Sequence, residues 1–96
     1  MYQYKIQPSL QKIMLRLFKK DKKTRERIIR KIYEIVNSED VEHYKNLKHD
    51  LKDFKRVQIG EKVLVFKYDK KNKLISFEDF DHVRNALISI SEHPKI

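Results

Sequence analysis

The residues best suited to catalysis lie in one short segment, Asp79-Phe80-Asp81-His82. His82 carries an imidazole that titrates near neutral pH, so it can accept or donate a proton during a reaction. Asp79 or Asp81 could orient that ring. Two residues further on, Arg84 could hold a phosphate through two parallel hydrogen bonds. The segment therefore predicts acid–base chemistry on an anionic substrate.

The same residues also fit a purely structural role. Asp81 is a good N-cap for a final helix over 83–91, and Arg84 would then lie on the surface of that helix. The four scattered histidines and the absence of cysteine do not predict a metal site, and no cofactor is expected. His49, which precedes Asp50, fits an exposed polar residue better than a catalytic one.

A further cation, Arg56, is predicted on a β-strand. In the run 54–59, Arg56 and Gln58 fall on one face and apolar residues on the other, because strand neighbours alternate in direction. We therefore expect Arg56, rather than Lys55, to face a site on the polar side of the strand.

The run continues into a predicted antiparallel sheet. Gly60-Glu61 suits a two-residue type II′ hairpin, which needs a positive φ at its first position. The next run, 62–68, is apolar on both faces, as in a central strand. A polar turn follows, in which Asn72 is the candidate for the left-handed conformation, and a third strand starts at Leu74.

The first half of the chain predicts a strand and two helices. Residues 2–6 alternate in polarity, and Pro8 fits the first position of a helix. Apolar residues then recur at helical spacing in two stretches, and Thr24 is the predicted N-cap of the second helix, which ends near Asn37. We expect the helices to run antiparallel and to bury their apolar stripes against the sheet. The segment 41–53 fits either a short helix or a loop.

Size and charge narrow the class of protein. The 96 residues carry 23 Lys and Arg against 14 Asp and Glu, a net charge of +9, which favours an anionic partner. One core fits this length, so we predict a single α+β domain over 1–96, with two N-terminal helices on a small antiparallel sheet and a short C-terminal helix. No apolar run approaches the roughly 20 residues of a membrane span. The N-terminus lacks a signal-peptide pattern, and the cysteine-free chain fits a cytoplasmic protein.

The positive charge is densest on the second predicted helix. We expect an RNA-binding surface there that continues onto the sheet and is formed by six cations, Lys22, Lys23, Arg27, Lys31, Lys55 and Lys62. The alternative is a solvated helix face whose charges only keep the protein soluble.

The order of strand, two helices and three-stranded meander resembles the RelE/ParE toxin superfamily over residues 2–87. Asn46-Leu47-Lys48, Leu51 and the strand 54–60 resemble the family pattern of leucine, basic, x, leucine and then a basic strand ending in glycine. The stretch 77–82 is similar to the end of the last strand in archaeal-type RelE-like toxins.

This resemblance implies a toxin that cuts mRNA on the ribosome without a metal, by attack of a ribose 2′-hydroxyl on the neighbouring phosphate. It also implies a cognate antitoxin that wraps over the toxin in a hetero-oligomer. Arg56 matches a basic strand position of the family, and His82 and Arg84 fall in its terminal region. These three are therefore the expected catalytic residues.

Three positions depart from the family pattern. Val63 falls where the family commonly has an arginine, Leu87 where it commonly has a tyrosine, and Gln58 where a second basic residue is usual. Lys62 cannot simply replace the arginine, because a neighbour of Val63 points to the opposite face of the strand. Two alternatives therefore stay open: a non-catalytic RelE-fold protein that binds an antitoxin or RNA, and a ParE-like topoisomerase inhibitor.

Overall fold

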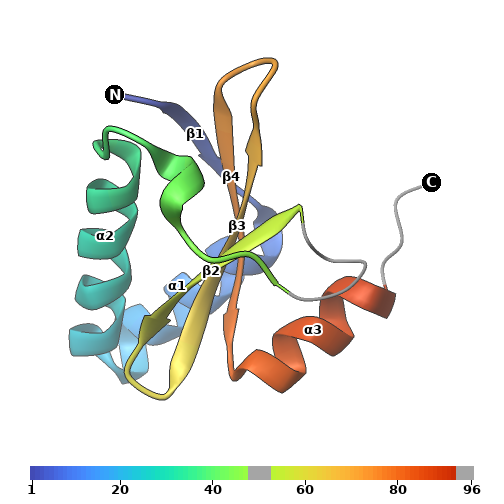
Figure 1. The fold of residues 1–96 in the computed structure, drawn as a ribbon. Helices are drawn as coiled ribbons and strands as arrows, with labels where there is room; N and C mark the ends of the chain where they lie inside the picture. The colour runs from blue at the N-terminus through green and yellow to red at the C-terminus, as the bar shows by residue number, and fades with distance from the viewer. Residues whose placement is uncertain (48–52, 93–96) are drawn as a thin grey trace.

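The computed structural model describes residues 1–47 and 53–92 and shows a four-stranded sheet with helices on both faces (Figure 1). The strands lie in the order β1-β4-β3-β2. β1 pairs in parallel with β4, and the other pairs are antiparallel. The predicted α+β class is confirmed, and the N-terminal run forms an edge strand. The bounds are β1 Gln3–Ile6, β2 Phe54–Ile59, β3 Lys62–Asp69 and β4 Leu74–Asp81.

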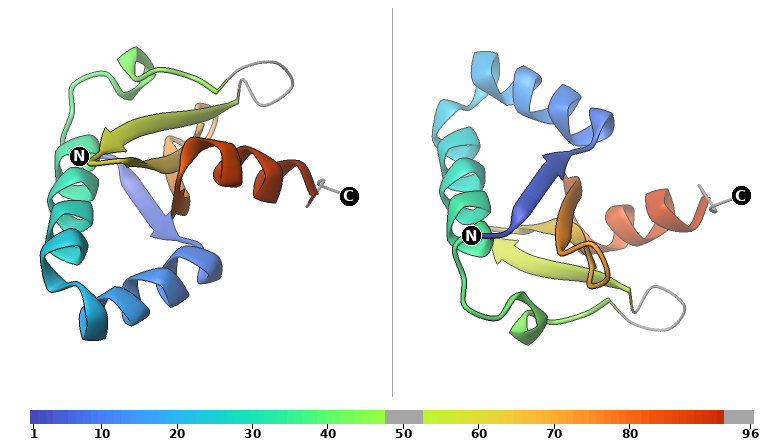
Figure 2. Two further views of the ribbon diagram at one scale, coloured as in Figure 1. Left: turned by 90° about the horizontal axis from the view of Figure 1, so that it is seen from below. Right: turned by 90° about the horizontal axis from the view of Figure 1, so that it is seen from above.

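Three α-helices flank the sheet, with α1 and α2 on one face and α3 on the other (Figure 2). α1 begins at Pro8, as predicted. The expectation that α1 and α2 run antiparallel is wrong, because they meet at an open angle around Asp21 (Figure 2). The bounds are α1 Pro8–Lys20, α2 Lys22–Val36 and α3 Val83–Glu92, with a short 3-10 turn, η1, at Val41–His43.

The start of α2 differs from the prediction by three residues. Asp21, not Thr24, is the N-cap. Thr24 donates its backbone N–H to Asp21 Oδ1 at 3.2 Å and its hydroxyl to Oδ2 at 2.6 Å. A carboxylate three residues before a threonine satisfies a free N–H of the first turn, so the helix can begin earlier than the threonine alone suggests.

The prediction for the β2–β3 turn is confirmed, and the prediction for the β3–β4 turn is wrong. Gly60 has a φ of +65°, and Glu61 does not have a positive φ, which fits type II′ rather than type I′. In the β3–β4 turn the left-handed residue is Lys73, with a φ of +53°, not Asn72. Asn72 instead donates its backbone N–H and its side-chain amide to the carboxylate of Asp69.

The two faces of the sheet bury different apolar clusters. Between the sheet and the helices α1 and α2 lies the larger one, which we call the helix-side core; its fully buried members include Leu10, Ile28, Ile35, Leu64, Phe66, Ile75 and Phe77. On the opposite face lies the α3-side cluster, formed by Leu47, Val63, Val65 and Ala86 with Phe54 and Leu87 packed against it. Among the described residues, α3 and Leu47 thus cover part of the second face.

A β-bulge in β4 decides which side chains face α3. Phe66 pairs with Phe77 but Val65 pairs with Asp79, so Glu78 is the extra residue. Because side chains alternate along a strand, this one-residue shift places Phe80 in the helix-side core and Asp79 on the face of Val65. Without the bulge, Asp79 would point into the core.

Candidate functional site

Arg56 lies half-buried on the face of the sheet that α3 partly covers. Lys55 and Val57, its neighbours in β2, both point to the opposite face, because Val57 packs on the helix-side core. Arg56 pairs with Val65 of β3, and Val65 pairs with Asp79 of β4. We call these three residues the Arg56 row. The prediction that Arg56 takes the polar face of its strand is confirmed.

His82 and Arg84 lie at the end of β4, beyond the Arg56 row. Both side chains are exposed, and His82 is the residue between β4 and α3. Its backbone N–H donates to Asp81 Oδ1 at 2.7 Å, and its carbonyl accepts the N–H of Ala86 at 2.9 Å, the first bond of α3. At about 3.3 Å per residue, His82 is roughly 10 Å further along the strand than Asp79. Convergence of Arg56, His82 and Arg84 on one substrate atom stays a prediction.

Asp81 does not cap α3 through the backbone of its first turn. Its Oδ1 accepts the N–H of His82 and, at 3.4 Å, the side-chain amide of Asn85. This holds the β4–α3 junction without using the imidazole ring. The ring of His82 is therefore left exposed at the junction, while the backbone of the same residue starts the helix.

Two of the three positions that depart from the family pattern, Val63 and Leu87, lie in one cluster. Val63 is buried in the α3-side cluster, and Leu87 of α3 packs against the same cluster. Lys62 points the other way, with its Nζ 5.7 Å from the ring centroid of Phe80 in the helix-side core. The prediction that Lys62 and Val63 take opposite faces is confirmed. The apolar side chains of Val63 and Leu87 thus pack next to Val65 of the Arg56 row.

Lys55, expected among the RNA-binding cations, is a buried structural lysine. Its side chain is 7% exposed, and its Nζ donates to the carbonyls of Glu42 and Tyr44 and to Asn46 Oδ1 at 2.9–3.2 Å. These three bonds match the three donors of an ammonium group. They tie the segment after η1 to β2, and no donor of Lys55 is left for a phosphate.

Arg27 and Lys62 come together at one end of the molecule. A Cβ on Gly60 would lie 3.3 Å from Arg27 Nη1, so the guanidinium covers the β2–β3 turn. The pKa of Asp21 is held below its ordinary value by hydrogen bonds from the Thr24 hydroxyl and backbone, and the charges of Lys62 and Arg27 lower it further. Because Val63 pairs with Asp81, this turn lies beside the β4–α3 junction.

The other cations of α2 spread over its surface. Lys22 lies over the ring of Phe18 on α1, 5.4 Å from its centroid, and Lys31 forms an ion pair with Glu34 at 3.1 Å. Lys23 is exposed. The first turn of α2 holds no acidic residue, although its positive dipole disfavours lysines there. Helix stability therefore does not explain Lys22 and Lys23. We call Lys22, Lys23, Arg27 and Lys62 the basic end.

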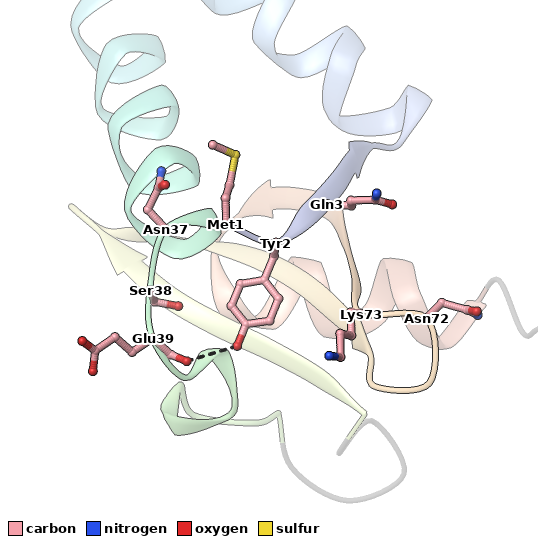
Figure 3. Close-up of a pocket in the computed structure, with 8 residues that line it drawn as sticks. All are labelled: Met1, Tyr2, Gln3, Asn37, Ser38, Glu39, Asn72 and Lys73. Atoms are coloured by element: carbon pink, nitrogen blue, oxygen red, sulfur yellow. Dashed lines mark hydrogen bonds between the residues drawn. The ribbon is translucent and has the colours of Figure 1, made fainter.

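One hollow in the surface is lined by other residues (Figure 3). It has a volume of about 700 Å³ and is lined by Met1, Tyr2, Gln3, Asn37, Ser38, Glu39, Asn72 and Lys73. The Tyr2 hydroxyl donates to the Glu39 carbonyl at 3.4 Å, which joins the N-terminus to the segment after α2 (Figure 3). None of the predicted site residues lines it.

Three further expectations concern metals, membranes and His49. Over 1–47 and 53–92, no three His, Cys, Asp or Glu side chains gather in a way that could hold a metal ion. Within the same ranges, no helix has both the length and the apolar character needed to cross a membrane. His49 and Asp50 lie outside the described residues.

Comparisons with known sequences show two similar archaeal proteins. A protein of Methanocaldococcus jannaschii named "Putative toxin RelE4" is 50% identical over 86 residues, covering 88% of this chain and 89% of that protein. An uncharacterized protein of Methanosarcina mazei is 41% identical over 83 residues, covering 85% of this chain and 94% of that protein. No protein-family model matches the chain.

Solved structures show the same fold at low sequence identity. The isolated E. coli RelE toxin superposes with a TM-score of 0.63 at 14% identity, covering 93% of this chain and 97% of that one. The toxin–antitoxin complex RelBE2 of Mycobacterium tuberculosis gives 0.58 at 16% identity, covering 84% and 96%. A mutant E. coli RelE in complex with an antitoxin RelBc peptide gives 0.60 at 15% identity, covering 99% and 97%.

Proposed function

The chain belongs to the RelE-like toxin family, and from this premise we propose that it is the toxin of a type II toxin–antitoxin pair that cuts mRNA on the ribosome. The observation that carries the proposal is the 50% identity to a named toxin over 88% of the chain. The fold adds support, because it is that of the E. coli RelE toxin. This activity needs no metal or cofactor and would be carried out in the cytoplasm, where ribosomes and mRNA are found.

The structure offers two surfaces for this activity. The Arg56 row presents a half-buried guanidinium on the α3 side of the sheet, where it could hold a phosphate and stabilise the charge that develops on it. The basic end presents three exposed cations of α2 and the partly exposed Lys62, which could bind ribosomal RNA or mRNA through phosphates. His82 lies between the two and is the proposed acid for the leaving oxygen.

An antitoxin is the proposed protein partner. Two of the structures that share the fold contain a toxin with its antitoxin, which supports a hetero-oligomer for this chain as well. An antitoxin would cover the toxin until it is degraded, and it would have to be complementary to a strongly basic protein. The net charge of +9 therefore favours a partner segment with an excess of Asp and Glu.

One observation favours a non-catalytic alternative. The positions of Val63 and Leu87, where the family commonly has an arginine and a tyrosine, are filled here by apolar packing against Val65 and Ala86. A chain with this change could keep the fold, bind an antitoxin or RNA, and cut nothing. In such a chain, any remaining cleavage activity would have to come from Arg56 and the residues near it.

Expression without a partner separates these functions. We expect induced expression to stop growth, to stop incorporation of labelled amino acids within minutes and to leave thymidine incorporation intact. Primer extension on an abundant mRNA should show new 5′ ends that require translation of that mRNA. Lost thymidine incorporation with intact mRNA would instead support topoisomerase inhibition. Normal growth at a verified protein level would support the non-catalytic alternative.

A further inference from the structure

Asp79 is the acidic member of the Arg56 row. Two strand spacings of about 4.8 Å, or roughly 10 Å, separate the backbones of Arg56 and Asp79, with Val65 between them. All three side chains leave the same face of the sheet. A guanidinium and a carboxyl group therefore leave this face on either side of Val65, which is fully buried in the α3-side cluster.

The bulge at Glu78 places Asp79 on the same face of the sheet as Val65. Bulges of this kind recur beside active sites, where they redirect a side chain. Asp79 Oδ1 accepts the backbone N–H of Phe80 at 2.9 Å. Its second oxygen has no hydrogen-bond partner among the described residues. One oxygen is thus held by the strand, and the other is available to a substrate.

Burial raises the pKa of Asp79 above its ordinary value, and the charges of Asp81 and Glu78 on the same strand raise it further. Arg56 of β2 and Lys67 of β3 leave the same face of the sheet, but no cation contributes to the shift of this pKa. A bound phosphate chain would add negative charge and raise the pKa again. A carboxylate with a raised pKa accepts a proton better than an ordinary surface carboxylate.

We propose that Asp79 is the general base of the cleavage reaction, a role that rests on the proposed function. Its free oxygen takes the proton of the ribose 2′-hydroxyl while Arg56 holds the neighbouring phosphate. The 2′-oxygen forms a bond to phosphorus, and the bond from phosphorus to the 5′-oxygen breaks. The leaving oxygen takes a proton from the imidazolium of His82, so the products are a 2′,3′-cyclic phosphate and a 5′-hydroxyl.

The spacing along β4 suits this division of roles. In-line attack places the base and the acid on opposite sides of phosphorus. Asp79 lies in the same row as Arg56, whereas His82 lies roughly 10 Å further along the strand. Asp79 is therefore the better partner for the attacking oxygen next to the phosphate held by Arg56, and His82 is left with the oxygen on the far side.

The test compares Asp79→Asn with Glu78→Gln, which removes the same charge one residue away. Single-turnover cleavage of a ribosome-bound mRNA is measured from pH 5 to pH 8. We expect Asp79→Asn to lower the rate about 10²-fold or more and Glu78→Gln to change it less than about threefold. The wild-type rate should rise with pH through the pKa of Asp79, and this rise should be missing in Asp79→Asn. Asp79→Ser should show the same loss, and thermal unfolding checks that each variant is folded.

The outcomes distinguish failure of the proposed role of Asp79 from failure of the proposed mRNA cleavage. Wild-type cleavage with an unchanged rate and pH profile in Asp79→Asn would overturn the role of Asp79 and leave the proposed function standing. An equal loss in Asp79→Asn and Glu78→Gln would also overturn it, because charge rather than position would then explain the effect. No cleavage by the wild type, with no new 5′ ends, would overturn the proposed function and this role with it.

Discussion

The Arg56 row and the basic end carry their charges in opposite ways. In the row, a half-buried arginine and a half-buried carboxyl group lie on the rigid strands of the sheet, with apolar side chains between them. At the basic end, long side chains of one sign project from α2 and from the start of β3. Fixed, partly desolvated groups can stabilise a transition state, whereas mobile exposed cations mainly attract phosphates. Under the proposed function, this difference leads us to expect chemistry in the first region and RNA affinity in the second.

Replacing Arg56 should have the largest effect on the chemical step. Because a fixed cation stabilises the developing charge on the phosphate, Arg56→Ala should lower single-turnover cleavage about 10²–10³-fold. Arg56→Lys should recover only part of this loss, since an ammonium cannot make the two parallel bonds of a guanidinium. Arg16→Ala, which removes an exposed arginine from α1, is the control and should change the rate less than twofold. Equal effects of Arg56→Ala and Arg16→Ala would contradict a site at the row.

Removing the imidazole of His82 should have the next largest effect. Loss of the group that protonates the leaving oxygen should slow cleavage by about 10²-fold in His82→Ala, with antitoxin binding unchanged. His43→Ala is the matched control, since His43 is also exposed and its Nδ1 contacts the backbone carbonyl of Asp40 instead. If His82→Ala cleaves a substrate whose leaving oxygen needs no proton at the wild-type rate, this would support His82 as the acid. Full activity on an ordinary mRNA would refute it.

Removing cations from the basic end should change the salt dependence of binding and leave the chemical step intact. Each phosphate contact contributes roughly 0.7–0.9 to the slope of log affinity against log salt, so Lys22, Lys23 and Arg27 changed together to Gln should flatten it by about 2. The control changes Lys70, Lys71 and Lys73, in the β3–β4 turn at the opposite end, to Gln. Ribosome binding measured between about 50 and 200 mM salt compares the two variants. Identical slopes for the two variants would indicate that Lys22, Lys23 and Arg27 form a solvated surface that does not contact phosphates.

The sequence predicts the sheet well where the pattern is local. The alternation in 54–59, the single glycine at Gly60 and the apolar run after it predict the β2–β3 hairpin, and the structure has it with the expected positive φ. The spacing of apolar residues in β4 also indicates the bulge. Ile75, Phe77 and Phe80 are spaced by two and then three residues, and this change of period marks an extra residue in the strand.

Contacts between distant segments explain what sequence alone could not supply. Lys55 is indistinguishable from its exposed neighbours in the chain, and only the path of the segment after η1 brings three acceptors to its ammonium group. In the same way, Val63 and Leu87 are 24 positions apart in sequence, yet both join the α3-side cluster once α3 folds onto the sheet. Local patterns therefore predicted the strands and the face of β2 on which Arg56 lies, and tertiary contacts decided that Lys55 is buried.

Lys55 should show the smallest effect on RNA binding of the six cations first expected to bind it. Replacing it by Met keeps most of its volume but leaves the carbonyls of Glu42 and Tyr44 and the amide oxygen of Asn46 without this donor. Because unsatisfied buried polar groups are costly, the free energy of unfolding should fall by about 2–3 kcal/mol in chemical denaturation. The salt slope of ribosome binding, measured where the variant is still folded, should match the wild type. A slope reduced by about one contact with unchanged stability would return Lys55 to the RNA-binding surface and weaken the division between the two regions.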